Sequence, residues 1–429
     1  MPFTNRAKFS PENNGKLGDL ISLGSWKQGV VNRVSEFNVP NDALLDALNV
    51  DIDNNGKIKR RKGYTKILSG NCHSLYSFGS YLYTVLNTDF IRIDTNGNTE
   101  TLINNYTTSP VNYVEIAGEL YFSTKNKTNK INKFNNVELW GIKSPQIQCE
   151  VVVGAENSGT LKKGKYRVNY SYSYGNYETG IYPIDVVVDV TYDNFSIDAK
   201  CIPTSESTSA NFYVSSTNGE ELYFAQSGYE VNIDFYDGLG NLPKLNSEAF
   251  PVLDNLTFSN GRIYGTLGSS IYFSNDRDYR QYNPMNYIGI DSTNIVILKA
   301  VDNGIYVVTE LATYFLTVKN PEDTENMQLV KVFDYSAIKG TLFEYQKNVG
   351  WLSTEGYIVG DNNGNLQNLT KDKIDFSKDY TDGTSLMIKK DGIHQVIFSL
   401  KQDGGKTTFQ TYEKDDIVWF DLIFLILYN

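Results

Sequence analysis

A short unit of strand, tight turn and strand recurs through most of this chain and limits what it can fold into. The first two copies begin near Ser74 and Val111, and each places aromatic residues in its middle strand. Further copies follow at 256–274, 298–318, 348–370 and 384–400. Short strands in units of roughly 40 residues stack as the blades of a β-propeller, because one unit cannot bury its apolar face alone. An array of β-sandwiches is the alternative.

The turns between these strands indicate antiparallel hairpins throughout. Asn-Gly tolerates the positive φ of a tight hairpin turn, and apolar alternation flanks it here. A content of 31 Tyr and 22 Phe is typical of strands. We therefore predict an all-β chain with a propeller of six or seven blades. The Asn-Gly pairs are Asn55-Gly56, Asn96-Gly97, Asn218-Gly219, Asn260-Gly261, Asn303-Gly304 and Asn363-Gly364.

The repeat stops in the middle of the chain, over 144–247. Strict alternation of Tyr166, Val168, Tyr170 and Tyr172 predicts an antiparallel strand exposed on one face. About seven strands in this region are typical of an immunoglobulin-like or fibronectin-type-III-like β-sandwich. We predict three parts: an N-terminal segment with the first blades (1–143), the inserted sandwich (144–247), and the remaining blades with a C-terminal tail (248–429).

Two elements are predicted ahead of the first repeat. The segment 41–48 has a capping residue before Ala and Leu and is the one convincing helical stretch. A hairpin follows, with strands at 48–52 and 57–64. Its turn resembles the opening of a calcium loop, but Lys62 stands where the last acidic ligand belongs, so we predict a turn without metal.

The second strand of this hairpin is strongly basic. Its functional interpretation is contact with DNA or with an acidic neighbouring subunit. The alternative is a solvated strand whose lysines protect a sheet edge from unwanted pairing. The candidate contact residues are Lys57, Lys59, Arg60, Arg61 and Lys62.

The sequence shows no combination of residues suited to a catalytic, metal or cofactor site. The two histidines, His73 and His394, lie far apart, and the three cysteines lack metal-ligand spacing. We expect buried free thiols, no signal peptide and no membrane segment. A net charge of −11 argues against tight binding of nucleic acid. The apolar C-terminus, 421–429, is expected to form a buried final strand or to dock on a partner.

Three stretches in this order resemble one family, the podovirus-type tail nozzle or tail hub proteins of tailed bacteriophages. The first, at 42–67, is similar to the family's N-terminal hairpin, in which an Ala-x-Asn-Val strand leads into a basic segment. The second, at 164–183 and 210–224, is similar to the domain inserted in its propeller. The third, at 256–291, 304–318 and 350–370, is similar to its second half.

This resemblance implies a structural, non-enzymatic virion protein of the tail, made in the host cytoplasm. It implies a homo-oligomeric ring, expected to be a hexamer, that contacts other tail or connector proteins. DNA would pass through the ring without specific binding, and no membrane would be involved. A receptor- or glycan-binding adhesin is the second hypothesis, and a propeller glycosidase is the third.

Overall fold

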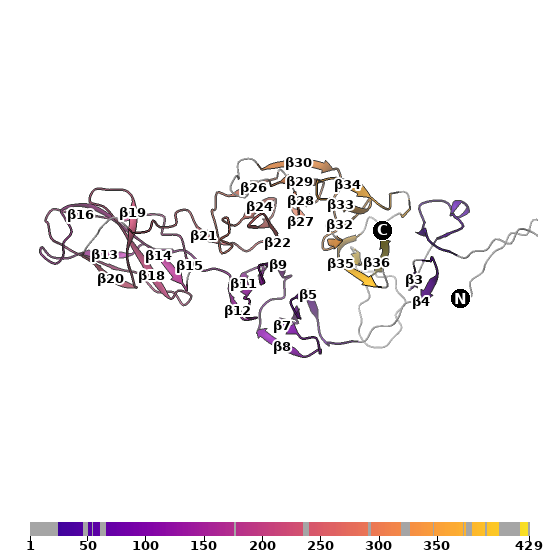
Figure 1. Cartoon of the computed structure of the whole chain (residues 1–429), viewed down its shortest axis with the longest axis horizontal. Helices are drawn as coiled ribbons and strands as arrows, with labels where there is room; N and C mark the ends of the chain where they lie inside the picture. Colours follow the sequence, from indigo (N-terminus) through magenta and orange to yellow (C-terminus); the bar gives the residue numbers. More distant parts are fainter. Residues whose placement is uncertain are drawn as a thin grey trace, which may run out of the picture.

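A computed structural model of the chain describes residues 25–427, apart from 46–49, 54, 61–65, 176, 235–239, 291–292, 319–326, 346, 372, 375–379, 391–392 and 403–420. The described residues form 37 strands, and their one helical element is a short 3-10 turn, η1 (Glu36–Asn38). Figure 1 shows a long molecule with three parts: a sandwich at one end, the propeller sheets in the middle and the N-terminal hairpin at the other end.

The propeller consists of six antiparallel sheets whose strands follow one another in chain order. Five have four strands and the last has three. The all-β propeller prediction is confirmed, with six such sheets in the described chain. The strands are β5 (Cys72–Phe78), β6 (Tyr81–Leu86), β7 (Asp89–Ile93) and β8 (Thr99–Ile103); β9 (Asn112–Ile116), β10 (Glu119–Thr124), β11 (Lys127–Ile131) and β12 (Val137–Leu139); β22 (Asp254–Ser259), β23 (Arg262–Leu267), β24 (Ser270–Phe273) and β26 (Tyr287–Gly289); β27 (Ile295–Val301), β28 (Gly304–Thr309), β29 (Thr313–Thr317) and β30 (Gln328–Phe333); β31 (Phe343–Tyr345), β32 (Asn348–Ser353), β33 (Gly356–Gly360) and β34 (Leu366–Asn368); β35 (Tyr380–Lys390), β36 (Ile393–Gln402) and β37 (Asp421–Leu427).

A separate apolar core lies between each pair of consecutive sheets, five in all among the described residues. The second strands build these cores by a simple rule. In the second, third and fourth sheets this strand sends an aliphatic side chain to the core shared with the preceding sheet and the next residue, a tyrosine, to the core shared with the following one. Leu120 and Tyr121 show the rule in the second sheet, and Ile263-Tyr264 and Ile305-Tyr306 repeat it. The alternation of strand side chains is what links neighbouring blades.

The fifth sheet departs from this rule at one position. Gly350 stands where the first four sheets have tyrosine, and the ring of Phe343 lies within 2.0 Å of where a Cβ would be. Phe343 stacks on Tyr357 and fills the core toward the sixth sheet instead. A glycine is needed here because a side chain would collide with that ring.

The inserted sandwich has two sheets, and its strands pair only with one another within the described residues. One sheet has the order β13-β17-β20, and the other β15-β14-β18-β19 with β16 also on β14. Its kinship with immunoglobulin or fibronectin-type-III domains, and the predicted boundaries at 144 and 247, stay predictions. The strands are β13 (Glu150–Val153), β14 (Gly164–Tyr174), β15 (Tyr177–Glu178), β16 (Val186–Val190), β17 (Ile197–Lys200), β18 (Ser209–Ser215), β19 (Leu222–Ser227) and β20 (Glu230–Ile233).

Strand β14 is buried on both faces, which differs from the prediction of one exposed face. Tyr166, Val168, Tyr170 and Tyr172 face the sandwich core as the alternation indicates. On the opposite face, Asn169 and Ser171 are also buried and take part in hydrogen bonds. Alternation identified the core face, but it could not show that polar side chains and a loop cover the other face.

The segment before the propeller forms short strands, so the helix predicted at 41–48 is wrong over its described part. Ala43 and Leu44 form β2 (Ala43–Leu44), which pairs in parallel with β1 (Gly29–Val30). A helix this short has few hydrogen bonds to offset the cost of its first turn. The hairpin strands are β3 (Val50–Ile52) and β4 (Ile58–Arg60). Two further strands, β21 (Glu248–Ala249) and β25 (Gln281–Tyr282), pair where the chain returns from the sandwich.

Candidate assembly surfaces

The basic hairpin lies at the end of the molecule opposite the sandwich (Figure 1). All three residues of β4 are exposed, and so is Lys57 in the turn before it. Lys59 forms an ion pair with Asp53 at 3.1 Å, and its side chain is 66% exposed. The structure thus brings Lys57, Lys59 and Arg60 together on one exposed strand, while Arg61 and Lys62 lie outside the described residues.

The hairpin turn uses its aspartate to hold the backbone. One oxygen of Asp53 accepts hydrogen bonds from the backbone N–H groups of Asn55 and Lys57, both at 2.9 Å. These bonds, the first of them from Lys57, and the Lys59 ammonium hold the pKa of Asp53 below its usual value. A carboxylate engaged in this way stabilises the hairpin turn that the sequence predicted.

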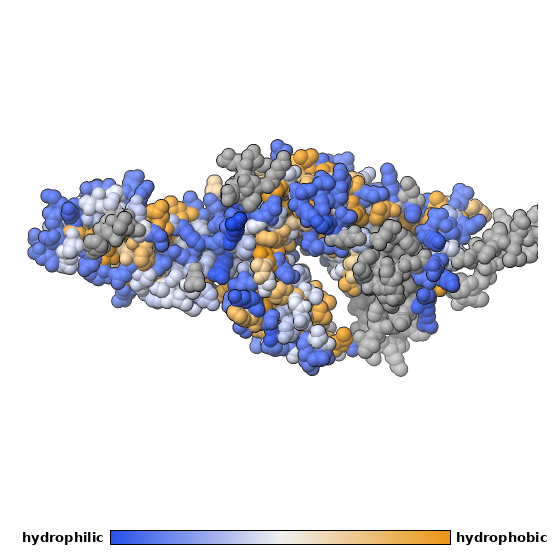
Figure 2. Space-filling model, in the orientation of Figure 1, coloured by the Kyte–Doolittle hydropathy of each residue, from blue (hydrophilic) through white to orange (hydrophobic). Residues whose placement is uncertain are grey.

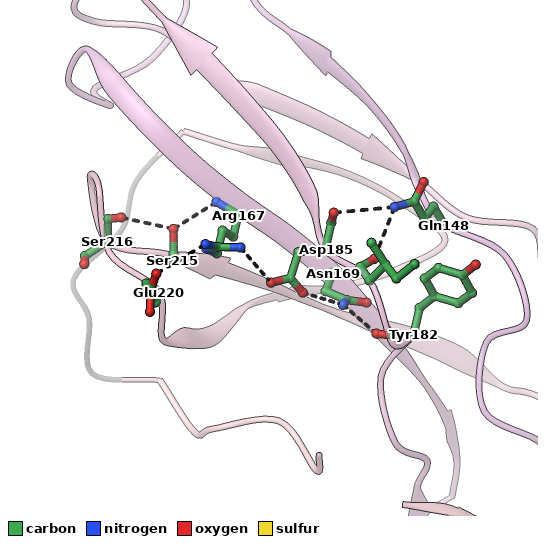
Figure 3. Close-up of polar contacts among 9 residues, drawn as sticks. Gln148, Arg167, Asn169, Tyr182, Asp185, Ser215, Ser216 and Glu220 are labelled. Atoms are coloured by element: carbon green, nitrogen blue, oxygen red, sulfur yellow. Dashed lines mark hydrogen bonds and ion pairs between the residues drawn. The ribbon is translucent and has the colours of Figure 1, made fainter. Parts of the chain in front are cut away.

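A polar network orders the sandwich where β16 begins, as Figure 3 shows. The buried amide of Asn169 donates to the carbonyl of Tyr182 at 2.8 Å and to the carboxylate of Asp185 at 2.7 Å. Asp185 also faces Arg167 at 3.7 Å, and Arg167 reaches Glu220 at 3.5 Å. The network fixes the 182–185 segment against β14, so the strand that follows is held in a defined position.

Apolar side chains are exposed along the same side of the sandwich. The amide of Gln148 donates to the carbonyls of Ile184 and Asp185 at 3.3 and 3.4 Å, which places the segment leading into β13 beside the one leading into β16. We call the exposed apolar residues of these segments and strands the sandwich edge. They are Ile147, Val152, Ile184 and Val187, between 47% and 63% exposed.

Buried contacts, rather than a free linker, join the sandwich to the propeller: the Gln281 amide donates to the carbonyl of Glu178 in β15 at 3.0 Å, and the Arg280 guanidinium lies over the Tyr177 ring. Trp140 stacks on Phe250 with ring centroids 5.0 Å apart, and its indole N–H donates to the carbonyl of Tyr279 at 2.7 Å. The Ser144 hydroxyl donates to the carbonyl of Ser247 at 2.8 Å. The two connecting segments are therefore packed together before the sandwich begins.

A buried lysine lies at this joint. Lys130 is 3% exposed and pairs with Glu119 at 3.0 Å and Glu138 at 3.4 Å. Burial raises the pKa of Glu119, but the hydrogen bonds from Lys130 and Tyr121 outweigh it, so its pKa is lower than usual. The cavity beside these residues measures about 10 Å³, room for one water and far below the roughly 300 Å³ of a small-molecule site.

Apolar side chains are also exposed on the segment that returns from the sandwich. Leu242 and Leu245 are 63% and 66% exposed. Figure 2 shows apolar surface where the sandwich meets the propeller. This segment is thus both exposed and apolar, unlike the buried outgoing connection.

His73 and the two buried cysteines lie in different parts of the described chain, His73 in the first propeller sheet and Cys149 and Cys201 in the sandwich core. His73 is partly buried, which lowers its pKa. Burial raises the pKa of the Cys149 thiol to about 12 and that of Cys201 to about 11, so both stay protonated. These two thiols are buried as expected, whereas Cys72 is exposed. Within the described residues no group of three His, Cys, Asp or Glu could hold a metal, and no helix there has the length and apolarity to cross a membrane.

Comparisons with known proteins give no family for the chain. No protein family and no curated protein matches its sequence. Among solved structures, streptogramin B lyase is similar at 10% identity with a TM-score of 0.32, covering 77% of this chain and 90% of that one. Apo AztD from Citrobacter koseri is similar at 12% identity with a TM-score of 0.27, covering 71% and 86%. Likenesses this distant carry no argument about what the chain does.

The sandwich edge and the buried joint were not predicted from the sequence. The run 186–190, with four valines around one aspartate, carried a signal for the edge, because a strand without Lys or Pro is not protected against pairing. The joint had no comparable signal. Lys130, Tyr177 and Arg280 come from three distant segments and meet only in the folded chain.

Proposed function

We propose that this chain is a structural, non-catalytic subunit of a bacteriophage tail, a nozzle or hub protein that assembles into a ring around the path of the DNA. The observation that carries the proposal is the order of its parts. A basic hairpin is followed by two propeller sheets, an inserted sandwich and the remaining sheets. This is the order in which the three stretches resemble the tail nozzle family.

Physical features of the surface support an assembly role. A ring needs two different surfaces on one rigid body, so that each copy contacts the next in the same way. Buried contacts between Gln281 and Glu178 and between Arg280 and Tyr177 hold the sandwich and the propeller as one body, and exposed surfaces lie at both ends of it. An acidic chain of net charge −11 would repel passing DNA rather than hold it.

The test is to locate the chain in purified phage particles by mass spectrometry and in an electron-microscopy map. We expect it in the tail, as a sixfold ring around the DNA channel. Purified protein should hydrolyse no polysaccharide, peptide or phosphate substrate. Absence of the chain from particles, or turnover that a single carboxylate substitution abolishes, would contradict the proposal.

A further inference from the structure

We propose that the basic hairpin of one copy binds the sandwich edge of the next copy in a head-to-tail contact. The inference rests on the proposed function, since it names the contact between copies that a ring requires. The occupant of the sandwich edge is thus a second copy of this chain, through β4 and the turn residue Lys57.

The strands of the sandwich edge can pair with an additional strand. Strand β13 pairs with β17, and β16 pairs with β14, so each leaves an outer backbone edge without a strand partner among the described residues. Proteins usually protect such edges with charged residues, above all Lys, with Pro or with a bulge. Strand β16 reads Val-Val-Val-Asp-Val, with one charged residue and neither Lys nor Pro, and pairs in regular register over all five residues.

Within the described residues, β4 pairs only with β3. Strands β3 and β4 form a two-stranded sheet, which is marginally stable alone in water. Ile58 of β4 is 40% exposed although it is apolar. Lys57 and Arg60 form no ion pair within the described residues, so their charges face solvent. An added strand would supply backbone hydrogen bonds, an apolar neighbour for Ile58 and counter-charges.

The hairpin and the sandwich edge are complementary in charge as well as in their ability to form backbone hydrogen bonds with each other. Glu150 of β13 and Asp189 of β16 are exposed on the strands that form the sandwich edge. Asp189 has a loose partner in Lys165, at 3.8 Å with both side chains more than 60% exposed. Three exposed cations beside an isoleucine on the hairpin therefore meet carboxylates beside valines on the edge. Complementary charges of this kind fix register and speed association.

One copy cannot satisfy both surfaces itself. The hairpin and the sandwich lie at opposite ends of the molecule with the propeller sheets between them (Figure 1). A contact between two different surfaces on identical copies is heterologous, so repeated copies form a ring if the rotation closes and a filament if it does not. The sandwich edge and the hairpin are thus the two halves of one repeated interface.

The experiment uses two interface variants of the full chain. Lys57→Glu with Arg60→Glu reverses the hairpin charges, and Val187→Lys with Asp189→Lys blocks the edge. Lys125→Glu with Lys339→Glu is the matched control for the first. Val330→Lys with Glu206→Lys is the control for the second, since these four positions are exposed elsewhere. Circular dichroism checks that every variant is folded.

Mass photometry at several protein concentrations then measures the mass of the oligomers that form. We expect wild type and both controls to form oligomers, and each interface variant to stay monomeric with affinity reduced at least about tenfold. A mixture of the two interface variants should form dimers of twice 48.4 kDa, because one intact hairpin meets one intact edge.

Other outcomes separate the inference from the proposed function. If either interface variant assembles like wild type, or if the mixture gives no dimer, the inference is wrong while a ring-forming tail role stands. If the hairpin variant loses affinity for duplex DNA but still assembles, the hairpin serves DNA and the inference is also wrong. If wild type stays monomeric yet is found in the tail of particles, the inference fails and the proposed location holds.

Discussion

At the scale of single residues, one arrangement of a side-chain oxygen recurs in four turns. In each, an Asp or Asn oxygen accepts hydrogen bonds from the backbone N–H groups two and four residues later. The residue three positions after this Asp or Asn has a positive φ, +85° at Gly97 and +63° at Asn135. The side-chain oxygen thus accepts hydrogen bonds within the turn that a backbone carbonyl would otherwise accept. The residues are Asp53, Asp94, Asn132 and Asp361.

Replacing the buried member of this set should destabilise the protein. Asn132 is 8% exposed and accepts from the N–H groups of Phe134 and Asn136 at 2.9 and 3.0 Å. We expect Asn132→Ala to cost about 1–2 kcal/mol, because two backbone donors lose their acceptor and the Glu138 carboxylate loses the hydrogen bond that the Asn132 amide donates. Asn136→Ala, at an exposed neighbour, should be close to neutral. Urea denaturation measures both, and equal effects would show that the side-chain bonds contribute nothing.

Asp361 is a charged member of these four turn residues, and its titration makes the stability of the protein depend on pH. Burial raises the pKa of Asp361, but hydrogen bonds from Asn365 and Asn363 outweigh it, so its pKa lies below the usual 3.8. The stabilisation is therefore complete above about pH 4 and is lost as the pH falls through the folded-state value. Asp361→Asn should lose less stability than wild type between pH 5 and pH 2. The urea midpoint at each pH checks this, and parallel curves would contradict it.

The sequence predicted some of these turns and not the others, for a physical reason. Asn96-Gly97 and Asn363-Gly364 stand out because glycine and asparagine are the common residues at positive φ. The equivalent turn at Asn132 has Asn135 in the positive-φ position, so no Asn-Gly pair marks it. The basic hairpin was located correctly from its charge run, but its ion pair to Asp53 depends on a register that only the folded hairpin shows.

At the scale of elements, the strand repeat was predictable and the connections were not. Regular spacing and buried aromatics predicted the sheets, since these depend on side chains along one strand. The predicted helix at 41–48 was wrong because backbone pairing with Gly29 and Val30, distant in the sequence, prevailed over local preference. The burial of Ser144 and Pro145 likewise depends on a segment about a hundred residues away.

These differences in burial predict where proteases cut first. The sequence alone favours both ends of the insert, near 141–145 and 238–243. In the structure Ile142, Ser144 and Pro145 are buried, whereas Leu242 and Leu245 are exposed. Brief digestion with chymotrypsin should therefore cut after Leu245, since Pro243 blocks cleavage after Leu242. The two fragments should stay together, because the buried joint still holds them. Mass spectrometry of the first products measures this. A first cut at 141–145 would contradict it.

At the scale of the whole molecule, the apolar interior is divided. The sandwich core belongs to the sandwich apart from Ile142 and Leu139 of the connecting segment, and the propeller has its own series of cores between sheets. The joint between them is built from the cations of Lys244 and Arg280 over the Tyr177 ring, the hydrogen bond from Gln281 to Glu178 and the hydrogen bond from Ser144 to Ser247. A divided interior of this kind weakens the coupling between the two parts, because each can lose its packing while the other keeps its own.

Thermal unfolding should consequently show two transitions that respond to different substitutions. Phe195 is fully buried in the sandwich core and packs edge-on against Tyr166, with ring centroids 5.6 Å apart. Ile305 is fully buried between the third and fourth propeller sheets. Phe195→Ala should cost about 3–5 kcal/mol and Ile305→Ala about 2–5 kcal/mol, from lost burial and the cavity left behind. Differential scanning calorimetry should show the first variant lowering one transition and the second variant lowering the other. A single transition that both variants shift alike would mean that the joint couples the sandwich and the propeller into one cooperative unit.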